Sequence, residues 1–342
     1  MDRQDRSPQQ SGFVIFFFDL LKLTGIIGHK ELSINRVLYS FGLIAAAGYA
    51  WRFFDPGGLD RHKVRRALNA AVLHFFLPAL AFSLMATTRV DRSFLAVPLT
   101  AAVVTLLGFA AGFVVYKFID ARLAPIPRPS LGALILAAAL GNVTYLGLPL
   151  ITEMLGEQFG YVAILYDLLA STPLLLTAGV FIAARYGEGE TVSIAASIRR
   201  VLMLPPLWGA AAGIGFLVTG VTVPDIVLYT TRLMGKAVIP VMIFTVGLAL
   251  DFKDLRRLPI AMPALVLKLV MAPVLAWWVG SQLGISASTL KAVALEGATP
   301  VMVLSLVIAD EFKLDVPLAA ACITVSTVAS FFTIPVMMGV LF

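Results

Sequence analysis

The chain has 342 residues, of which 59% are hydrophobic and only 13% are charged. This composition lies far outside the range of soluble globular domains and indicates a membrane protein. The net charge of +6 does not indicate nucleic-acid binding, because the basic residues cluster in short loops between apolar segments, where lipid headgroups and membrane orientation account for them.

Residues that carry metal or catalytic chemistry are sparse. There is one cysteine, Cys322, and three scattered histidines, and no HExxH, paired CxxC, GxGxxG or GxxxxGK[ST] pattern is found. Intramembrane proteases need two facing carboxylates, commonly in a GxGD motif, or a GxSG-type serine with a histidine in a neighbouring span. Neither arrangement is found, so we expect no cofactor, no firm metal site and no enzymatic activity.

The first 36 residues form an extension ahead of the apolar segments. A polar tip is followed by the 17-residue apolar run GFVIFFFDLLKLTGIIG, which contains Asp19 and Lys22. This run is short and charged for a membrane span, so it predicts an interfacial helix in 1-36.

Ten apolar segments are each long enough to cross a bilayer. The predicted spans are 37-54, 68-86, 94-117, 130-155, 160-184, 201-219, 232-250, 259-283, 287-309 and 315-341. Loops on the side that follows the first span hold 15 basic residues, against 5 on the opposite side, or 10 with the extension included. Because cytoplasmic loops are enriched in Lys and Arg, both ends of the ten-span unit are predicted to lie outside.

The second five spans resemble the first five in order. LPALAFSLMAT in the second span matches IPVMIFTVGLA in the seventh, and the third and eighth spans each follow an arginine and carry a proline six residues later. The fourth and ninth spans contain LGNVTYLGLPL and EGATPVMVLSL, each with glycine, small polar residues and proline at mid-span. An odd number of spans per repeat requires the two halves to be inverted with respect to the membrane.

Helix-breaking residues in the fourth and ninth spans predict a binding site. Irregular backbone at membrane depth is tolerated only where it lines a cavity or is buried in protein. Two breaks related by inverted symmetry would meet and present free N–H and C=O groups to an anion or a cation. The alternative is that these residues only kink the helices, with Asn142 or Thr144 capping a half-helix instead of binding substrate.

The sequence GNVTYLGLPL resembles the GNTGFLGLPL-type motif of the auxin efflux carrier family, in the bile acid/auxin/arsenite transporter superfamily, and the chain resembles its bacterial-type members. Further matches follow in order from Leu38 to the C-terminus: GYAWRFFDPGGLD, LNAAVLHFFLPALAF, LMGKAVIPVMIFTVGLAL, LVLKLVMAPVL, and ATP followed by LVIADEF. Family members often have an asparagine a few residues after the second proline, where this chain has Leu304 and Ser305.

The resemblance implies an all-α membrane protein of ten helices in two inverted five-helix repeats, with the broken helices 4 and 9 crossed. A scaffold domain (37-86 and 201-250), which mediates dimerisation, would support an elevator-type transport domain (94-184 and 259-342). The crossing would bind an organic anion. The expected substrate-binding residues are Asn142, Thr144, Tyr145, Gly147, Pro149, Thr299, Pro300 and Ser305.

Three ionisable residues within spans are candidates for coupling, since intramembrane charge is costly. Glu296 precedes the second break, in a placement that resembles a glutamate of the bile-acid sodium symporters, and we consider sodium or a proton as its ligand. Asp167 either titrates during transport or pairs permanently with Lys268. Lys268 alternatively attracts the anion.

The function expected from the sequence is a multi-pass carrier of small organic anions, carboxylates in particular, in the bacterial inner (plasma) membrane. Its expected partners are the anion, membrane lipid and a second copy of the chain. The alternatives are a sodium- or proton-coupled symporter of the bile-acid type and a transporter-like sensor.

Overall fold

The computed structural model describes residues 31–54, 56–89, 91–188, 193–252 and 255–342. Within these residues every regular element is a helix, and one isolated antiparallel bridge joins Gly141 to Val301. The prediction of an all-α protein is therefore confirmed. The predicted interfacial helix lies in residues 1–30, outside the described part, and the first described helix already begins at Glu31.

Seven helices or continuous helix series in the described part are long and apolar enough to cross a membrane. They are Arg36–Phe54, Arg61–Thr87, Ser93–Arg122, Glu157–Tyr186, Asp225–Ala249, Leu258–Gln282 and Val316–Leu341. An eighth candidate is a pair, Ala195–Leu202 and Pro205–Thr219, bent by 60°. The remaining two predicted spans, 130-155 and 287-309, are interrupted, so neither forms one long helix.

The helical elements that form the packed structure follow one another in chain order. They are α2 (Glu31–Phe54), α3 (Arg61–Ala71), η3 (Val72–Phe76), α4 (Leu77–Thr87), α5 (Ser93–Arg122), α6 (Arg128–Ala139), η4 (Val143–Gly147), α7 (Leu148–Met154), η5 (Glu157–Phe159), α8 (Gly160–Tyr166), η6 (Asp167–Ser171), α9 (Thr172–Leu174), η7 (Leu175–Gly179), α10 (Val180–Tyr186), α11 (Ile194–Leu202), α12 (Pro205–Thr219), α13 (Asp225–Lys236), α14 (Val238–Ala249), α15 (Leu258–Val266), η9 (Leu267–Met271), α16 (Ala272–Gln282), α17 (Ala287–Gly297), α18 (Ser305–Glu311) and α19 (Val316–Leu341).

Prolines account for four wide turns inside the helices. The π-helical segments η3, η4, η6 and η9 each end two residues before a proline, at Pro78, Pro149, Pro173 and Pro273. Proline has no N–H and its ring crowds the preceding turn, so the chain widens locally instead of breaking. Asp167 and Lys268, the two charged residues buried in uninterrupted spans, both lie in such segments.

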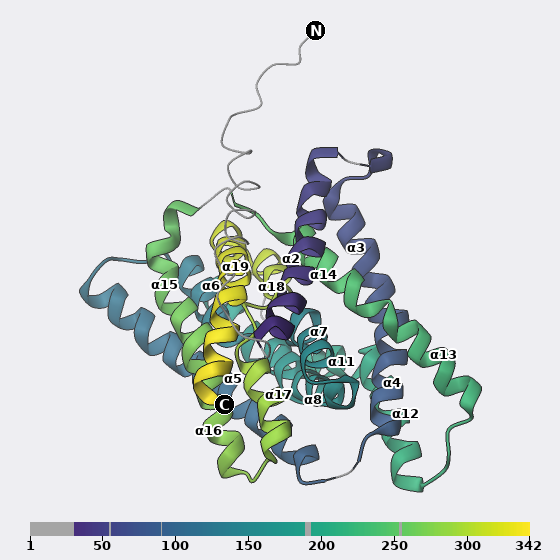
Figure 1. Cartoon of the computed structure of the whole chain (residues 1–342). Coiled ribbons are helices and arrows are strands. Elements are labelled where there is room, and N and C mark those ends of the chain that lie inside the picture. Colours follow the sequence, from purple (N-terminus) through teal and green to yellow (C-terminus); the bar gives the residue numbers. More distant parts are fainter. Residues whose placement is uncertain (1–30, 55, 90, 189–192, 253–254) are drawn as a thin grey trace.

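The helices pack in two sets (Figure 1). In one, α12 and α13 pack against α4, and α14 packs along α2. In the other, α5 packs against α6 and α16, and α16 packs against α17. In Figure 1, α3, α4, α12 and α13 lie to the right, and α5, α6, α15 and α16 lie to the left. The division of the chain into a scaffold domain and a transport domain stays a prediction.

Some helices begin earlier than predicted. The seventh span was expected at 232-250, but its helix series begins at Asp225; the second was expected at 68-86, but its series begins at Arg61. The early turns at 61–67 are strongly basic, with Arg61, Lys63, Arg65 and Arg66, whereas those at 225–231 hold one charged residue, Asp225, and two threonines. Lys and Arg side chains have apolar stems and can extend their charged ends to the membrane surface. The helix can therefore continue into a basic segment whose mean hydropathy is low.

Candidate functional site

The two interrupted segments meet. Helix α6 ends at Ala139 and the chain becomes helical again at Val143, while α17 ends at Gly297 and α18 begins at Ser305. Between these ends the chains run antiparallel: the Asn142 amide donates to the Pro300 carbonyl at 2.7 Å, and the Met302 amide donates to the Leu140 carbonyl at 3.0 Å. The prediction that the two breaks meet is confirmed, and we call residues 140–142 and 298–304 the crossover.

The crossover satisfies backbone groups that the broken helices leave free. Its two hydrogen bonds are of the kind found in a β-ladder, which lets non-helical backbone remain buried. Gly141 is required here, because a Cβ atom would lie 2.6 Å from the Thr299 Oγ1 atom and 2.9 Å from the Lys268 Cε atom. The Ser326 hydroxyl accepts a bond from the Val301 amide at 3.0 Å.

Ser326 was missed by the sequence reasoning. It lies in α19 with Thr327 and Ser330, and all three are buried. Polar residues at these positions of an apolar helix were a signal that α19 faces irregular backbone.

Asn142 presents an unused donor at the crossover. Its side chain is 1% exposed, and its Nδ2 atom has no hydrogen-bond partner among the described residues. It does not cap η4, and the Thr144 hydroxyl donates to the Asp167 carboxylate. The alternative that these two side chains cap the half-helix is therefore wrong.

Asp167 and Lys268 do not pair with each other among the described residues, so the predicted Asp–Lys pair is wrong. The Asp167 carboxylate accepts hydrogen bonds from Thr144 and, at 2.7 Å, from Thr172. The Lys268 Nζ atom donates to the Gly297 carbonyl at 2.6 Å. Because Gly297 ends α17, its carbonyl belongs to the negative end of the helix dipole, which attracts a cation. Lys268 therefore faces the crossover.

Glu296 is the least compensated group at the site. It is 1% exposed, and neither carboxylate oxygen has a hydrogen-bond partner among the described residues. The carboxylate packs against Gly147 on the opposite broken helix, and Lys268 and Asp167 both interact with it electrostatically. A buried carboxylate is stable only when it is paired, protonated or bound to a cation.

The remaining predicted residues lie on or next to the crossover. Thr299 donates to the Glu296 carbonyl and Ser305 to the Met302 carbonyl, both at 2.6 Å. Tyr145 is half-buried in η4, and Pro149 begins the turn that follows it. No cluster of three or more metal-ligating side chains is found in the part of the chain that the structure describes.

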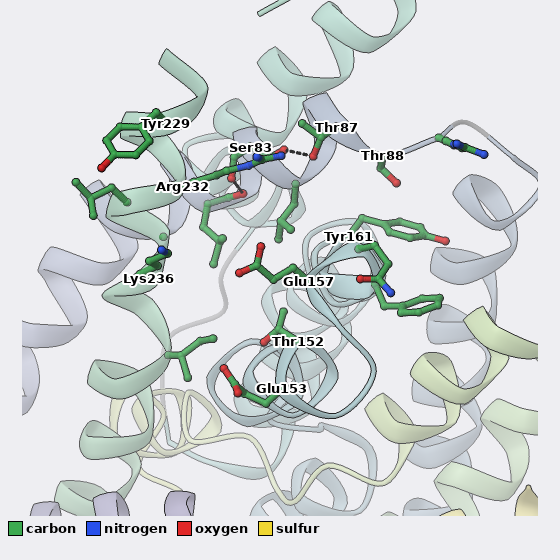
Figure 2. Close-up of a pocket in the computed structure, with 18 of the residues that line it drawn as sticks. Ser83, Thr87, Thr88, Thr152, Glu153, Glu157, Tyr161, Tyr229, Arg232 and Lys236 are labelled. Carbon is green, nitrogen blue, oxygen red and sulfur yellow. Dashed lines mark hydrogen bonds between the residues drawn. The ribbon is translucent and has the colours of Figure 1, made fainter. Parts of the chain in front are cut away.

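A chamber of about 1240 Å³ opens beside the crossover helices (Figure 2). One wall is formed by α4 and α13, with Tyr229, Arg232 and Lys236 along one face of α13. The other wall is formed by α7, η5 and α8, with Glu153 and Glu157. The sequence did not indicate this chamber, because its lining comes from segments far apart in the chain.

Three helix starts are tied together on the opposite side of the molecule. The Arg257 guanidinium donates to the Asp315 carboxylate at 2.7 Å and to Ser130 at 3.1 Å, and Ser130 donates to Asp315 at 2.5 Å. Burial alone would raise the pKa of the Asp315 carboxyl, but these bonds and that of the Leu318 amide hold the pKa below its usual value.

Comparison with known proteins gives consistent similarities. The sequence model described as "Membrane transport protein" matches residues 43–338. An "uncharacterized transporter" of Methanothermobacter thermautotrophicus is 29% identical over 271 residues, 78% of this chain and 86% of that protein. One of Methanocaldococcus jannaschii is 26% identical over 306 residues, 85% and 94% respectively. A "putative malonate transporter" of Rhizobium meliloti is 26% identical over 245 residues, 70% and 73%.

Proposed function

Because this chain belongs to the membrane transport protein family, which is the auxin efflux carrier family, we propose that it carries small organic anions, carboxylates in particular, across the plasma membrane by alternating access. Membership confirms the resemblance drawn from the sequence. The chain is a multi-pass membrane transport protein and not an enzyme.

The observation that carries the proposal is the unpaired side-chain Nδ2 group of Asn142, directly before the helical run 143–154. The first turn of that run leaves backbone N–H groups without helical partners, and its dipole end is positive. The opposing carbonyl end, at Gly297, is already bound by Lys268. The first break therefore still offers donors and a positive helix end, which suit a carboxylate, while the unpaired Glu296 carboxylate on the second break would need a proton or a cation beside a bound anion.

The substrate class follows from the same geometry. The second break has no side-chain amide to match Asn142. It has Ser305, whose hydroxyl already donates to the Met302 carbonyl. Recognition would then rest mainly on the first break and on Lys268, which suits a small acid. The similarity to the Rhizobium meliloti protein makes malonate the first acid to test.

The movement that we propose divides the chain as the resemblance implied. Residues 37–86 and 201–250 would form a scaffold through which two copies associate, and 94–184 with 259–342 would move as the transport unit. The separate packing of α2 with α14 and of α4 with α12 supports a self-contained scaffold. The chamber, lined from both sets of helices, supports movement between them.

Coupling to sodium or a proton is the second candidate mechanism, and Glu296 favours it. A carboxylate that is buried without a hydrogen-bond partner is suited to taking up a cation. Lys268 opposes this, because its ammonium group already supplies positive charge nearby. Asp167 is less suited, since two hydroxyl groups already satisfy it.

Uptake of radiolabelled malonate into proteoliposomes tests the proposal. Saturable uptake that Asn142→Ala weakens supports a carrier with its site at the crossover. Uptake that requires sodium or a proton gradient, and loses that requirement in Glu296→Gln, supports the coupled mechanism. Malonate binding without uptake would favour a sensor.

A further inference from the structure

The chamber between the two sets of helices has charged walls of opposite sign. On α13, Arg232 and Lys236 are exposed to the chamber one helical turn apart, with Tyr229 one turn before Arg232. On the facing wall, Glu153 and Glu157 are also exposed. Figure 2 shows these side chains around one open space.

The walls do not neutralise each other. Among the described residues, no ion pair or hydrogen bond involves the side chains of Arg232, Lys236, Glu153 or Glu157. Two unpaired cations one turn apart, with side chains about 5–6 Å from each other at Cβ, can hold the two carboxylates of a small diacid, and arginine can bind one of them through two parallel bonds.

The chamber is also lined by part of the first broken helix. Thr152 and Glu153 line it and belong to α7, the half-helix that leads back to Pro149 and the crossover. The chamber lies on the side of loop 88–92, which the loop charges assign to the exterior.

We propose that Arg232 and Lys236, with the Tyr229 hydroxyl, form a docking site for a small dicarboxylate in this chamber, separate from the crossover. The inference rests on the proposed function, since it places a second site on the path of the same substrate. When the transport unit moves and the chamber narrows, Glu153 and Glu157 approach the same cations and compete with the anion, which is released toward the crossover.

A labelling experiment tests docking without requiring transport. The sole cysteine, Cys322, is 0% exposed, so Thr87→Cys introduces one reactive thiol beside the α13 wall, where Figure 2 shows Arg232 directed toward Ser83 and Thr87. The rate of reaction with a neutral maleimide is measured in detergent with and without malonate. Thr88→Cys, in the same lining, replaces Thr87→Cys if that variant does not fold.

Docking predicts that malonate slows labelling severalfold, and that the slowing is lost in Arg232→Gln/Lys236→Gln. In Glu153→Gln/Glu157→Gln, a lower malonate concentration should slow labelling to the same extent, because the competing carboxylates are gone. Asn142→Ala should leave the slowing intact. The opposite charges could instead serve only to hold the two walls together. Both double variants would then shift the malonate dependence of labelling in the same direction, which would overturn the proposal.

Two further outcomes would also overturn it. In the first, malonate slows the labelling of neither the Thr87→Cys protein nor any variant of it. In the second, the slowing vanishes in Asn142→Ala and persists in Arg232→Gln/Lys236→Gln, which would mean that the thiol reports closure driven from the crossover. The protein could also show the labelling pattern expected for docking and yet take up no malonate. That result would support the docking site and contradict the proposed carrier function.

Discussion

The Glu296 carboxylate fills the space that any side chain at position 147 would need, so Gly147 and Glu296 occupy one shared volume between the two broken helices. Gly147 belongs to the first break and Glu296 to the second. A change at either position therefore alters the relation between the two halves of the proposed site.

Gly147→Ala should displace the Glu296 side chain and impair transport. Forcing a methyl group into a packed interior costs about 1–3 kcal/mol. Adding Glu296→Ala should restore the space, so the double variant should melt at a higher temperature than Gly147→Ala alone. Thermal unfolding in detergent measures both.

Gly215→Ala is the matched control, because nothing lies within 4 Å of a Cβ atom at that position of α12. It should melt at the temperature of the parent or slightly above it, because alanine favours a helix more than glycine does. A double variant no more stable than Gly147→Ala would contradict the shared volume.

Asn142→Ala should weaken substrate binding more than it weakens the fold. The backbone of Asn142 makes the crossover bond and its side-chain nitrogen makes none, so truncation leaves the pairing with Pro300 in place. Loss of one hydrogen bond to a charged ligand costs about 1.5–3 kcal/mol, roughly a tenfold weaker Kd or more.

Ser326→Ala should show the reverse. It removes the partner of the buried Val301 amide, which costs about 1–3 kcal/mol of unfolding free energy, while leaving Asn142 free to bind. Isothermal titration with malonate and thermal melts of both variants make the comparison. Equal losses of affinity in the two variants would argue that Asn142 acts only through the fold.

Glu296→Gln should not destabilise the protein, because it removes a buried carboxylate that has no hydrogen-bond partner in the described part of the chain. In the coupled mechanism the same variant loses the dependence of uptake on pH or sodium. Melting temperature and uptake between pH 5 and 8 are the measurements. A large fall in melting temperature would show that a bound group normally compensates the carboxylate.

Asp315→Asn should destabilise the protein at neutral pH and progressively less in acid. The pKa of Asp315 is lower in the folded state, so its ionised form adds stability above the unfolded value of about 3.9, and this is lost as the pH falls through the folded pKa. In melts from pH 7 to pH 3, the difference between parent and variant should therefore be constant down to about pH 5 and should begin to shrink as the pH falls below about pH 4. A constant difference across that range would reject the ionic role of Asp315.

The sequence predicted where the helices break but not how the breaks are stabilised. Glycine and proline at 141–149 and 297–300 were sufficient to place the interruptions, because few residues change backbone geometry so strongly. The bond from Val301 to Ser326 joins the non-helical crossover to α19, and nothing local to either position indicates it.

The sequence located the buried charged residues Asp167 and Lys268 but did not indicate their hydrogen-bond partners. Asp167 and Lys268 were recognised as intramembrane charges, and a permanent pair between them was one of the alternatives left open for Asp167. The structure gives Asp167 two hydroxyl groups and gives Lys268 a helix-end carbonyl instead. The chamber was not predicted, because its charged walls come from helices that hydropathy treats as separate spans.

The central claim is that the crossover binds and carries a carboxylate. Purified protein in liposomes on a solid-supported membrane should give a saturable current after concentration jumps of malonate in sodium-free buffer at equal pH, and Asn142→Ala should require a higher concentration for half-maximal current. Malate, succinate, lactate and indole-3-acetate, tested in parallel, would define the acid preferred. No current for any of these acids, with or without sodium or a proton gradient, would contradict the account.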